Sequence, residues 1–149
     1  MATGYVIADT TNNADALTSI DSNFTKVPGI LGKVADVDLK TTGQTTLYTV
    51  PAASTGCVVT DVMLMISDSD TATIGPTVQV GVTPSFNEWL GSTALTTLTS
   101  LYKSKSLNSV ATGREPMAFG PTDVIKLDIT VGATATSLRA TVVILGFNL

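Results

Sequence analysis

Residues 124–131 read Val-Ile-Lys-Leu-Asp-Ile-Thr-Val, and apolar and polar side chains alternate along this run. A period of two places successive side chains on opposite faces of an extended chain, which is typical of a half-buried β-strand. The predicted apolar face consists of Ile125, Leu127, Ile129 and Val131. Because no long helical period separates this run from similar ones, a parallel sheet built from βαβ units is excluded.

Comparable β-branched runs follow one another from about residue 37 onward, separated by Gly, Pro, Ser, Asp and Asn. The expected strands span residues 35–40, 44–50, 57–67, 77–83, 98–103, 116–119, 124–131 and 137–147. Short strands at a spacing of about ten residues are typical of sandwiches and barrels. We therefore expect an all-β fold, a jelly-roll-like antiparallel β-sandwich, with a plain antiparallel barrel as the second choice.

Two of these runs, residues 58–66 and 141–147, are apolar at nearly every position. A strand with this pattern is covered on both faces, so both are expected to be central strands. One of the two covered faces can be covered by a neighbouring subunit.

The first 35 residues differ in character and are expected to form an extended N-terminal arm ahead of a sandwich domain of residues 36–149. Asn13 followed by an acidic first turn predicts one or two helical turns over residues 13–21, and residues 27–32 are expected to be irregular. The arm has too many apolar side chains for a solvated tail, so we expect it to pack on a neighbouring protomer or a larger scaffold. Its candidate partner-contact residues are Tyr5, Val6, Ile7, Leu17, Ile20, Phe24, Ile30 and Leu31.

Composition limits the possible partners of the chain. Its 149 residues correspond to one domain. Charged residues make up 13% of the sequence, against about 25% in typical proteins, so the surface is either neutral or covered by other subunits. A net charge of -4 argues against binding nucleic acid. The first basic residue is Lys26 and no apolar stretch approaches membrane-spanning length, so we expect cytoplasmic synthesis without a signal peptide and no membrane partner.

Catalytic and metal-binding chemistry is also restricted by the residues present. The chain has no histidine and one cysteine, Cys57, which excludes His-based triads, His-containing metal sites and internal disulfides. Cys57 lies in an apolar run and is expected to be a buried small hydrophobe. Asp68 and Asp70 are too few ligands for a strong Ca²⁺ site and are expected in a turn. Asp36 and Asp38 alternate along a strand, and the short loops leave no cleft in which two acids could flank a glycosidic bond. We therefore expect no catalytic residue, metal, cofactor or small-molecule substrate.

Two further segments carry candidate partner contacts. Phe86 and Trp89 are the one concentration of aromatic residues beside polar groups; a single helical turn that buries both is the simpler interpretation, and a carbohydrate or partner contact is the alternative. Lys103, Lys105 and Arg114 concentrate basic charge in a chain poor in cations. A solvated loop is the simpler interpretation for them, and contact with an acidic partner surface is the alternative.

Several strings resemble a known group of proteins. Residues 40–52 read Lys-Thr-Thr-Gly-Gln-Thr-Thr-Leu-Tyr-Thr-Val-Pro-Ala, and residues 76–83 read Pro-Thr-Val-Gln-Val-Gly-Val-Thr. With the long strand over 57–66 and the closing pair from 124 and 141, they resemble small virion proteins of tailed bacteriophages over about residues 37–149. The resemblance implies a capsid decoration, or cement, protein that sits as a trimer on the outside of the head and clamps neighbouring major capsid subunits. It implies no catalytic residues.

The sequence thus predicts a non-enzymatic structural protein of the virion. The expected partners are the major capsid protein and two further copies of this chain, and the expected location is the capsid surface. The alternative is a fibre, neck or receptor-binding sandwich that contacts host glycan through residues 86–89. A hydrolase is disfavoured by the lack of histidine and of a cleft with paired acids.

Overall fold

The computed structural model describes residues 28–108 and 116–149. The helical turn expected over 13–21 lies outside these residues. So do seven of the candidate contacts, namely Tyr5, Val6, Ile7, Leu17, Ile20, Phe24 and Arg114.

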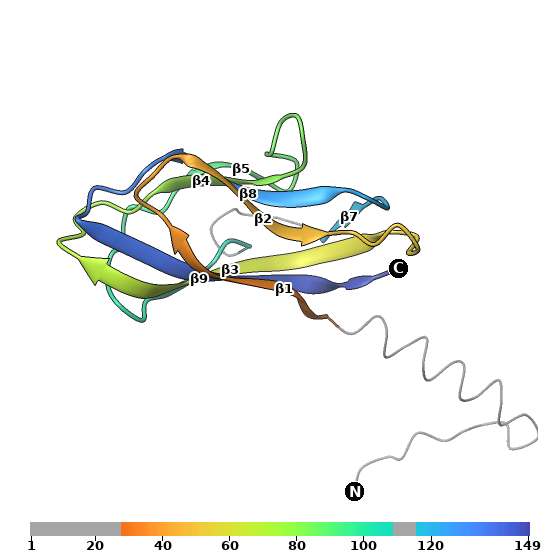
Figure 1. The fold of residues 1–149 in the computed structure, drawn as a ribbon, viewed down its shortest axis with the longest axis horizontal. Helices are drawn as coiled ribbons and strands as arrows, with labels where there is room; N and C mark the ends of the chain where they lie inside the picture. The colour runs from red at the N-terminus through yellow and green to blue at the C-terminus, as the bar shows by residue number, and fades with distance from the viewer. Residues whose placement is uncertain (1–27, 109–115) are drawn as a thin grey trace, which may run out of the picture.

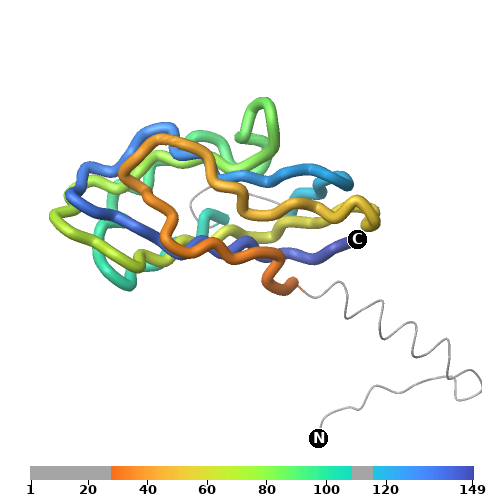
Figure 2. Tube along the Cα trace, in the orientation of Figure 1, coloured from red at the N-terminus to blue at the C-terminus, as the bar shows by residue number. Residues whose placement is uncertain are grey.

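The described residues form nine β-strands arranged in two antiparallel sheets that lie face to face (Figures 1 and 2). The strands are β1 (Gly29–Asp38), β2 (Gly43–Thr49), β3 (Cys57–Asp70), β4 (Thr77–Gly81), β5 (Leu90–Ala94), β6 (Ser104–Ser106), β7 (Met117–Phe119), β8 (Val124–Val131) and β9 (Ser137–Asn148). One sheet, here called the β9 sheet, has the order β1-β9-β3-β6, with β7 also paired to β3. The other, the β8 sheet, has the order β2-β8-β4-β5. The expected all-β antiparallel sandwich is confirmed.

The core lies between the two sheets and follows the period of two. Ile125, Leu127 and Ile129 of β8 are buried, as their alternation predicts. Val131 is 58% exposed instead, because the pairing of β8 with β4 shifts by one residue after Ile129. A register shift of this kind turns the next side chain to the other face.

The runs expected to be central strands are central in the β9 sheet. β9 lies between β1 and β3, and β3 lies between β9 and the short strands β6 and β7. Both strands send one set of side chains into the core, including Leu64 of β3 and Val142 of β9. Their other set faces outward.

Two expectations about strand ends were wrong. Residues 29–32 are not irregular but begin β1, because Ile30 pairs with Leu145 and the β-bulges in β1 absorb the irregular geometry. The segment containing Asp68 and Asp70 is not a turn up to residue 70, because β3 continues there in pairing with β9. In each case the partner strand overrides local turn chemistry.

The edge strands also differ from expectation. Residues 98–103 form a loop, and the strand lies just beyond them as β6, where Lys105 pairs with Leu64. β5 was not expected at all. Its residues, Leu-Gly-Ser-Thr-Ala, are mostly small and give no strand signal, and its pairing with β4 creates it.

Candidate interaction surfaces

The outward faces of the two sheets differ in chemistry. On the β8 sheet that face is polar, and its side chains bond to one another across strands. Gln79 Nε2 donates to Asp128 Oδ2 at 2.7 Å, and Lys126 Nζ donates to Gln44 Oε1 at 3.4 Å. The outward face of the β8 sheet is therefore suited to exposure to solvent.

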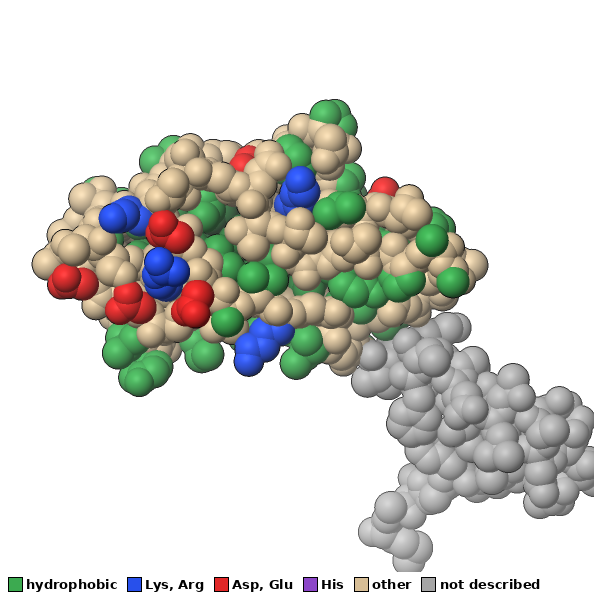
Figure 3. Space-filling model, viewed as in Figure 1, with side chains coloured by type: hydrophobic (Ala, Val, Ile, Leu, Met, Phe, Trp, Pro, Cys, Tyr) green, Lys and Arg blue, Asp and Glu red, His purple; other side chains and the backbone are tan. Residues whose placement is uncertain are grey.

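The outward face of the β9 sheet carries a cluster of apolar side chains. Directly paired residues of antiparallel strands share a face, so the register places the outward side chains of β1, β9 and β3 together. Ile30 is 67% exposed, Met65 48% and Met63 36%, and the others are half-buried. We call this set the apolar outer face; it consists of Ile30, Val58, Met63, Met65, Val143, Leu145 and Phe147. Hydrophobic side chains protrude along the lower border of Figure 3, the side on which β1, β9 and β3 lie in Figure 1.

Charged residues bound this face at one end. The register places Arg139 of β9 between Asp38 of β1 and Asp68 of β3. Asp38 accepts hydrogen bonds from the backbone N–H of Lys40 and the hydroxyl of Thr41, both at 2.9 Å. The bond from Lys40 is the largest cause that lowers the pKa of Asp38 below its ordinary value. The carboxylate therefore remains charged beside Arg139 at neutral pH.

The loop before β6 exposes two further apolar side chains next to β3. Tyr102 is 79% exposed and has a φ of 61°, in the left-handed region that few non-glycine residues adopt. Its backbone N–H donates to Ile66 O at 3.0 Å, and Ile66 N–H donates to Lys103 O at 2.9 Å. These two bonds hold the loop tip, with the exposed Leu101, against β3.

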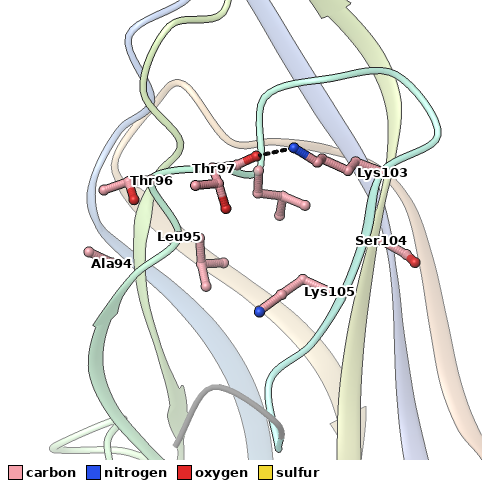
Figure 4. A pocket seen from close by; sticks show the side chains of 8 residues that line it. Ala94, Leu95, Thr96, Thr97, Lys103, Ser104 and Lys105 are labelled. Atoms are coloured by element: carbon pink, nitrogen blue, oxygen red, sulfur yellow. Dashed lines mark hydrogen bonds between the residues drawn. The ribbon is translucent and has the colours of Figure 1, made fainter.

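A pocket of about 250 Å³ lies at the sandwich edge, between β6 and the loop that follows β5. Its walls are formed by Ala94, Leu95, Thr96, Thr97, Leu98, Lys103, Ser104 and Lys105. The structure therefore brings Lys103 and Lys105 together in one site. Lys103 Nζ donates to the carbonyl of Thr97 at 3.0 Å (Figure 4).

The aromatic candidates behave differently from one another. Trp89 is 1% exposed, so its ring is part of the core and is not available to a partner. Phe86 is half-buried, and Lys126 Nζ lies 5.4 Å from its ring centroid. The helical turn expected over 86–89 does not form, because the single turn lies earlier, where Phe86 N–H donates to Val82 O at 2.8 Å.

Two candidate contacts at the start of β1, Ile30 and Leu31, lie on different faces at the bulge between Ile30 and Gly32. Ile30 faces outward on the apolar outer face. Leu31 is half-buried and packs against the core. Met63, Met65, Leu101 and Tyr102 are surface residues that the sequence reading missed. The methionines did lie in a run expected to be covered on both faces, which was the available signal.

The described residues contain no group of three or more His, Cys, Asp or Glu side chains placed to hold a metal ion. Burial raises the pKa of the Cys57 thiol to about 11, so the thiol stays protonated at neutral pH. Within the same residues, no helix combines the length and apolar character needed to cross a membrane.

No protein-family model matches the sequence, and no curated protein matches it significantly. Two solved structures have a similar fold. A chain of the cyanophage Pam1 capsid asymmetric unit aligns with a TM-score of 0.50 and 22% identity over 82% of this chain and 85% of that chain. A chain of the acidic stable capsid structure of Helicobacter pylori bacteriophage KHP30 aligns with a TM-score of 0.51 and 18% identity over 82% of this chain and 92% of that chain. The sandwich fold is thus shared with chains found in phage capsids.

Proposed function

We propose that this chain is a structural protein of a phage virion that binds the outside of the capsid as a decoration protein. The apolar outer face is the observation that carries the proposal. The core between the sheets does not include this face, and Ile30, Met63 and Met65 remain exposed in the single chain. A surface of this kind marks a contact with another protein.

The shape and chemistry of the face suit contact with a shell of repeated subunits. It lies on a five-stranded sheet, and two charged side chains share it: Lys33 of β1, which pairs with Val143, and Asp61 of β3, which pairs with Leu145. Covering it with capsid surface would remove the exposed parts of Ile30, Met63 and Met65 from water, which is favourable in proportion to the area buried. The proposed partner is the major capsid protein.

The proposed oligomer is a homotrimer, as the resemblance to decoration proteins implies. Three linked copies bind a shell far more tightly than one, because the second and third contacts form at high effective concentration. The fold shared with chains of two phage capsid structures supports a virion role. Nothing in this role requires catalysis.

The copy number per virion tests the proposal. In purified virions that contain this chain, gel densitometry against the major capsid protein should give hundreds of copies. A dozen or fewer would contradict decoration and support the alternative role in a fibre or neck.

The glycan-binding alternative has lost one of its two aromatic candidates, because Trp89 is buried. A glycan array probed with the purified protein tests what remains of it. Binding abolished by Phe86→Ala would favour the alternative, and we expect no such binding.

The N-terminal arm is proposed as a second contact surface of the assembly. Because β1 starts at Gly29, the sandwich needs the residues from 29 onward, and the truncation that separates arm from sandwich removes residues 2–27. We expect this truncation to retain the β-sheet circular dichroism of the full chain but to decorate capsids much more weakly. Equal decoration would show that the arm is not required.

A further inference from the structure

The pocket at the sandwich edge contains an ammonium group suited to bind an acid. Lys105 pairs with Leu64, whose side chain lies in the core, so the Lys105 side chain also points to the inner side of its sheet. In Figure 4 it extends from β6 across the cavity toward the loop after β5, while Ser104 points away. Lys105 is half-buried, and among the described residues its ammonium group has no hydrogen-bonded or ion-paired partner.

The remaining walls define the ligand further. Lys103 is a second cation, and none of the eight lining residues is acidic. A partly desolvated ammonium is stabilised most by a carboxylate that forms a charge-assisted hydrogen bond with it. Leu95 and Leu98 form an apolar wall, and the exposed Leu101 and Tyr102 follow in the same loop. The pocket therefore suits an acidic side chain flanked by apolar ones.

The chain itself contains such a segment. Before Lys26 the arm carries three acids, Asp9, Asp15 and Asp21, and no Lys or Arg. Asp21 stands among Leu17, Ile20 and Phe24, at spacings of three and four residues that fall on one face of a helical turn. Asp15 lies instead two residues after the expected helix cap, where a carboxylate stabilises the N-terminal end of the helix itself.

We propose that the pocket binds the carboxylate of Asp21 from the arm of a neighbouring copy. The arm joins the sandwich at Gly29 of β1, which is one edge of the β9 sheet, whereas the pocket lies at β6 and β5, the opposite edges of the two sheets. A contact from one edge to the opposite edge of the next copy is head-to-tail, and head-to-tail contacts close into a ring of three when each copy is rotated by a third of a turn from the last. The inference rests on the proposed homotrimer, for which it supplies the link between copies.

Charge reversal tests the contact through the oligomeric mass. We expect Asp21→Lys and Lys105→Asp each to weaken the trimer about tenfold or more, and the double variant to restore it. Asp9→Lys and Lys126→Asp are matched controls that make the same charge changes elsewhere and should leave the trimer unchanged. Equal effects of the controls, or no restoration in the double variant, would overturn the proposal.

Disulfide trapping in a mixture of two differently tagged chains tests which copy supplies the arm. Unlike charge reversal, this test does not require a double variant to restore the trimer. One tagged chain carries Asp21→Cys and a differently tagged full chain carries Lys105→Cys; the buried Cys57, with its raised pKa, does not compete. Mild oxidation should give a disulfide between the two tags, and Asp9→Cys should not replace Asp21→Cys. A third chain that carries both Asp21→Cys and Lys105→Cys shows whether the arm reaches the pocket of its own copy. A disulfide within this chain alone and none between the two tags, or no disulfide at all, would overturn the proposal.

These outcomes are separable from the proposed function. Copy number per virion and binding of the full chain to capsids do not depend on the identity of the contact between copies. If trapping fails while hundreds of copies are counted, the decoration role stands and the pocket assignment is wrong. If few copies are counted while trapping succeeds, the decoration role is wrong and the assignment stands.

Discussion

Placing positive charge on the apolar outer face should weaken binding to capsids without unfolding the protein. The perturbation is the double substitution Met63→Lys and Met65→Lys. Full burial of a methionine is worth about 1.5–3 kcal/mol, and these side chains are still 36% and 48% exposed, so covering them contributes about 1 kcal/mol each. Losing about 2 kcal/mol corresponds to roughly 30-fold weaker binding per face, and the cost of desolvating two ammonium groups adds to it.

The assay is titration of the protein onto capsids that lack it, with the bound fraction measured after pelleting. Thr49→Lys with Thr130→Lys is the matched control, because both residues are exposed and lie on the β8 sheet. We expect the control to bind as the unsubstituted protein does and both variants to keep their melting temperature within a few degrees, since exposed positions change stability little. Unchanged binding by the Met63/Met65 variant, or equal loss by the control, would refute the reasoning.

Three further predictions concern the sandwich itself. A Cβ at Gly132 would lie 1.8 Å from the carbonyl oxygen of Lys40, so Gly132→Ala should lower the free energy of unfolding by more than about 1 kcal/mol in urea titration, whereas Gly120→Ala, with its nearest atom 3.7 Å away, should be tolerated better. Because the pKa of Asp38 is lowered in the folded state, the Asp38 carboxylate stabilises the fold fully above the ordinary pKa near 3.8, and this stabilisation is lost as the pH falls through the lower folded value. Asp38→Asn should remove that part of the acid dependence of the free energy of unfolding. An acid profile equal to that of the unsubstituted protein would contradict this prediction. Cys57 should react with a thiol reagent at pH 8 only as the protein unfolds, and rapid labelling of the native protein would show that the thiol is accessible.

The parts of the fold that were predictable are those in which local pattern and tertiary environment agree. Ile125, Leu127 and Ile129 alternate with polar residues and are buried as the alternation requires. The two continuously apolar runs became the central strands β3 and β9. Both features follow from side-chain chemistry along a single strand.

The parts that were not predictable depend on pairing between distant segments. Pro28 and Gly29 predict a break, yet β1 begins at Gly29 because β9 offers it a partner. β5 has almost no strand signal of its own and exists as the neighbour of β4. Sequence pattern does not encode which edge is available to a weak strand, so boundaries and edges are where the expectations failed.

The candidate surfaces show the same division. Lys103 and Lys105 were recognisable as a basic pair, but their pocket needed the loop after β5 to form its other wall. Met63 and Met65 lie in a run that was expected to be a central strand and is one, and only the register shows that they face away from the core. Trp89 was a candidate contact because polar residues flank it in the sequence. Its large aromatic ring is buried in the core instead.

Methionine oxidation measured by mass spectrometry, on the free protein and on the decorated capsid, tests the central claim most directly. Met63 and Met65 lie on the apolar outer face, whereas Met117, 37% exposed, pairs with the core residue Val59 and serves as an internal reference. We predict that Met63 and Met65 are oxidised in the free protein and protected on the capsid, while Met117 is oxidised equally in both. Equal oxidation of Met63 and Met65 in the two states would contradict the assignment of this face to the capsid.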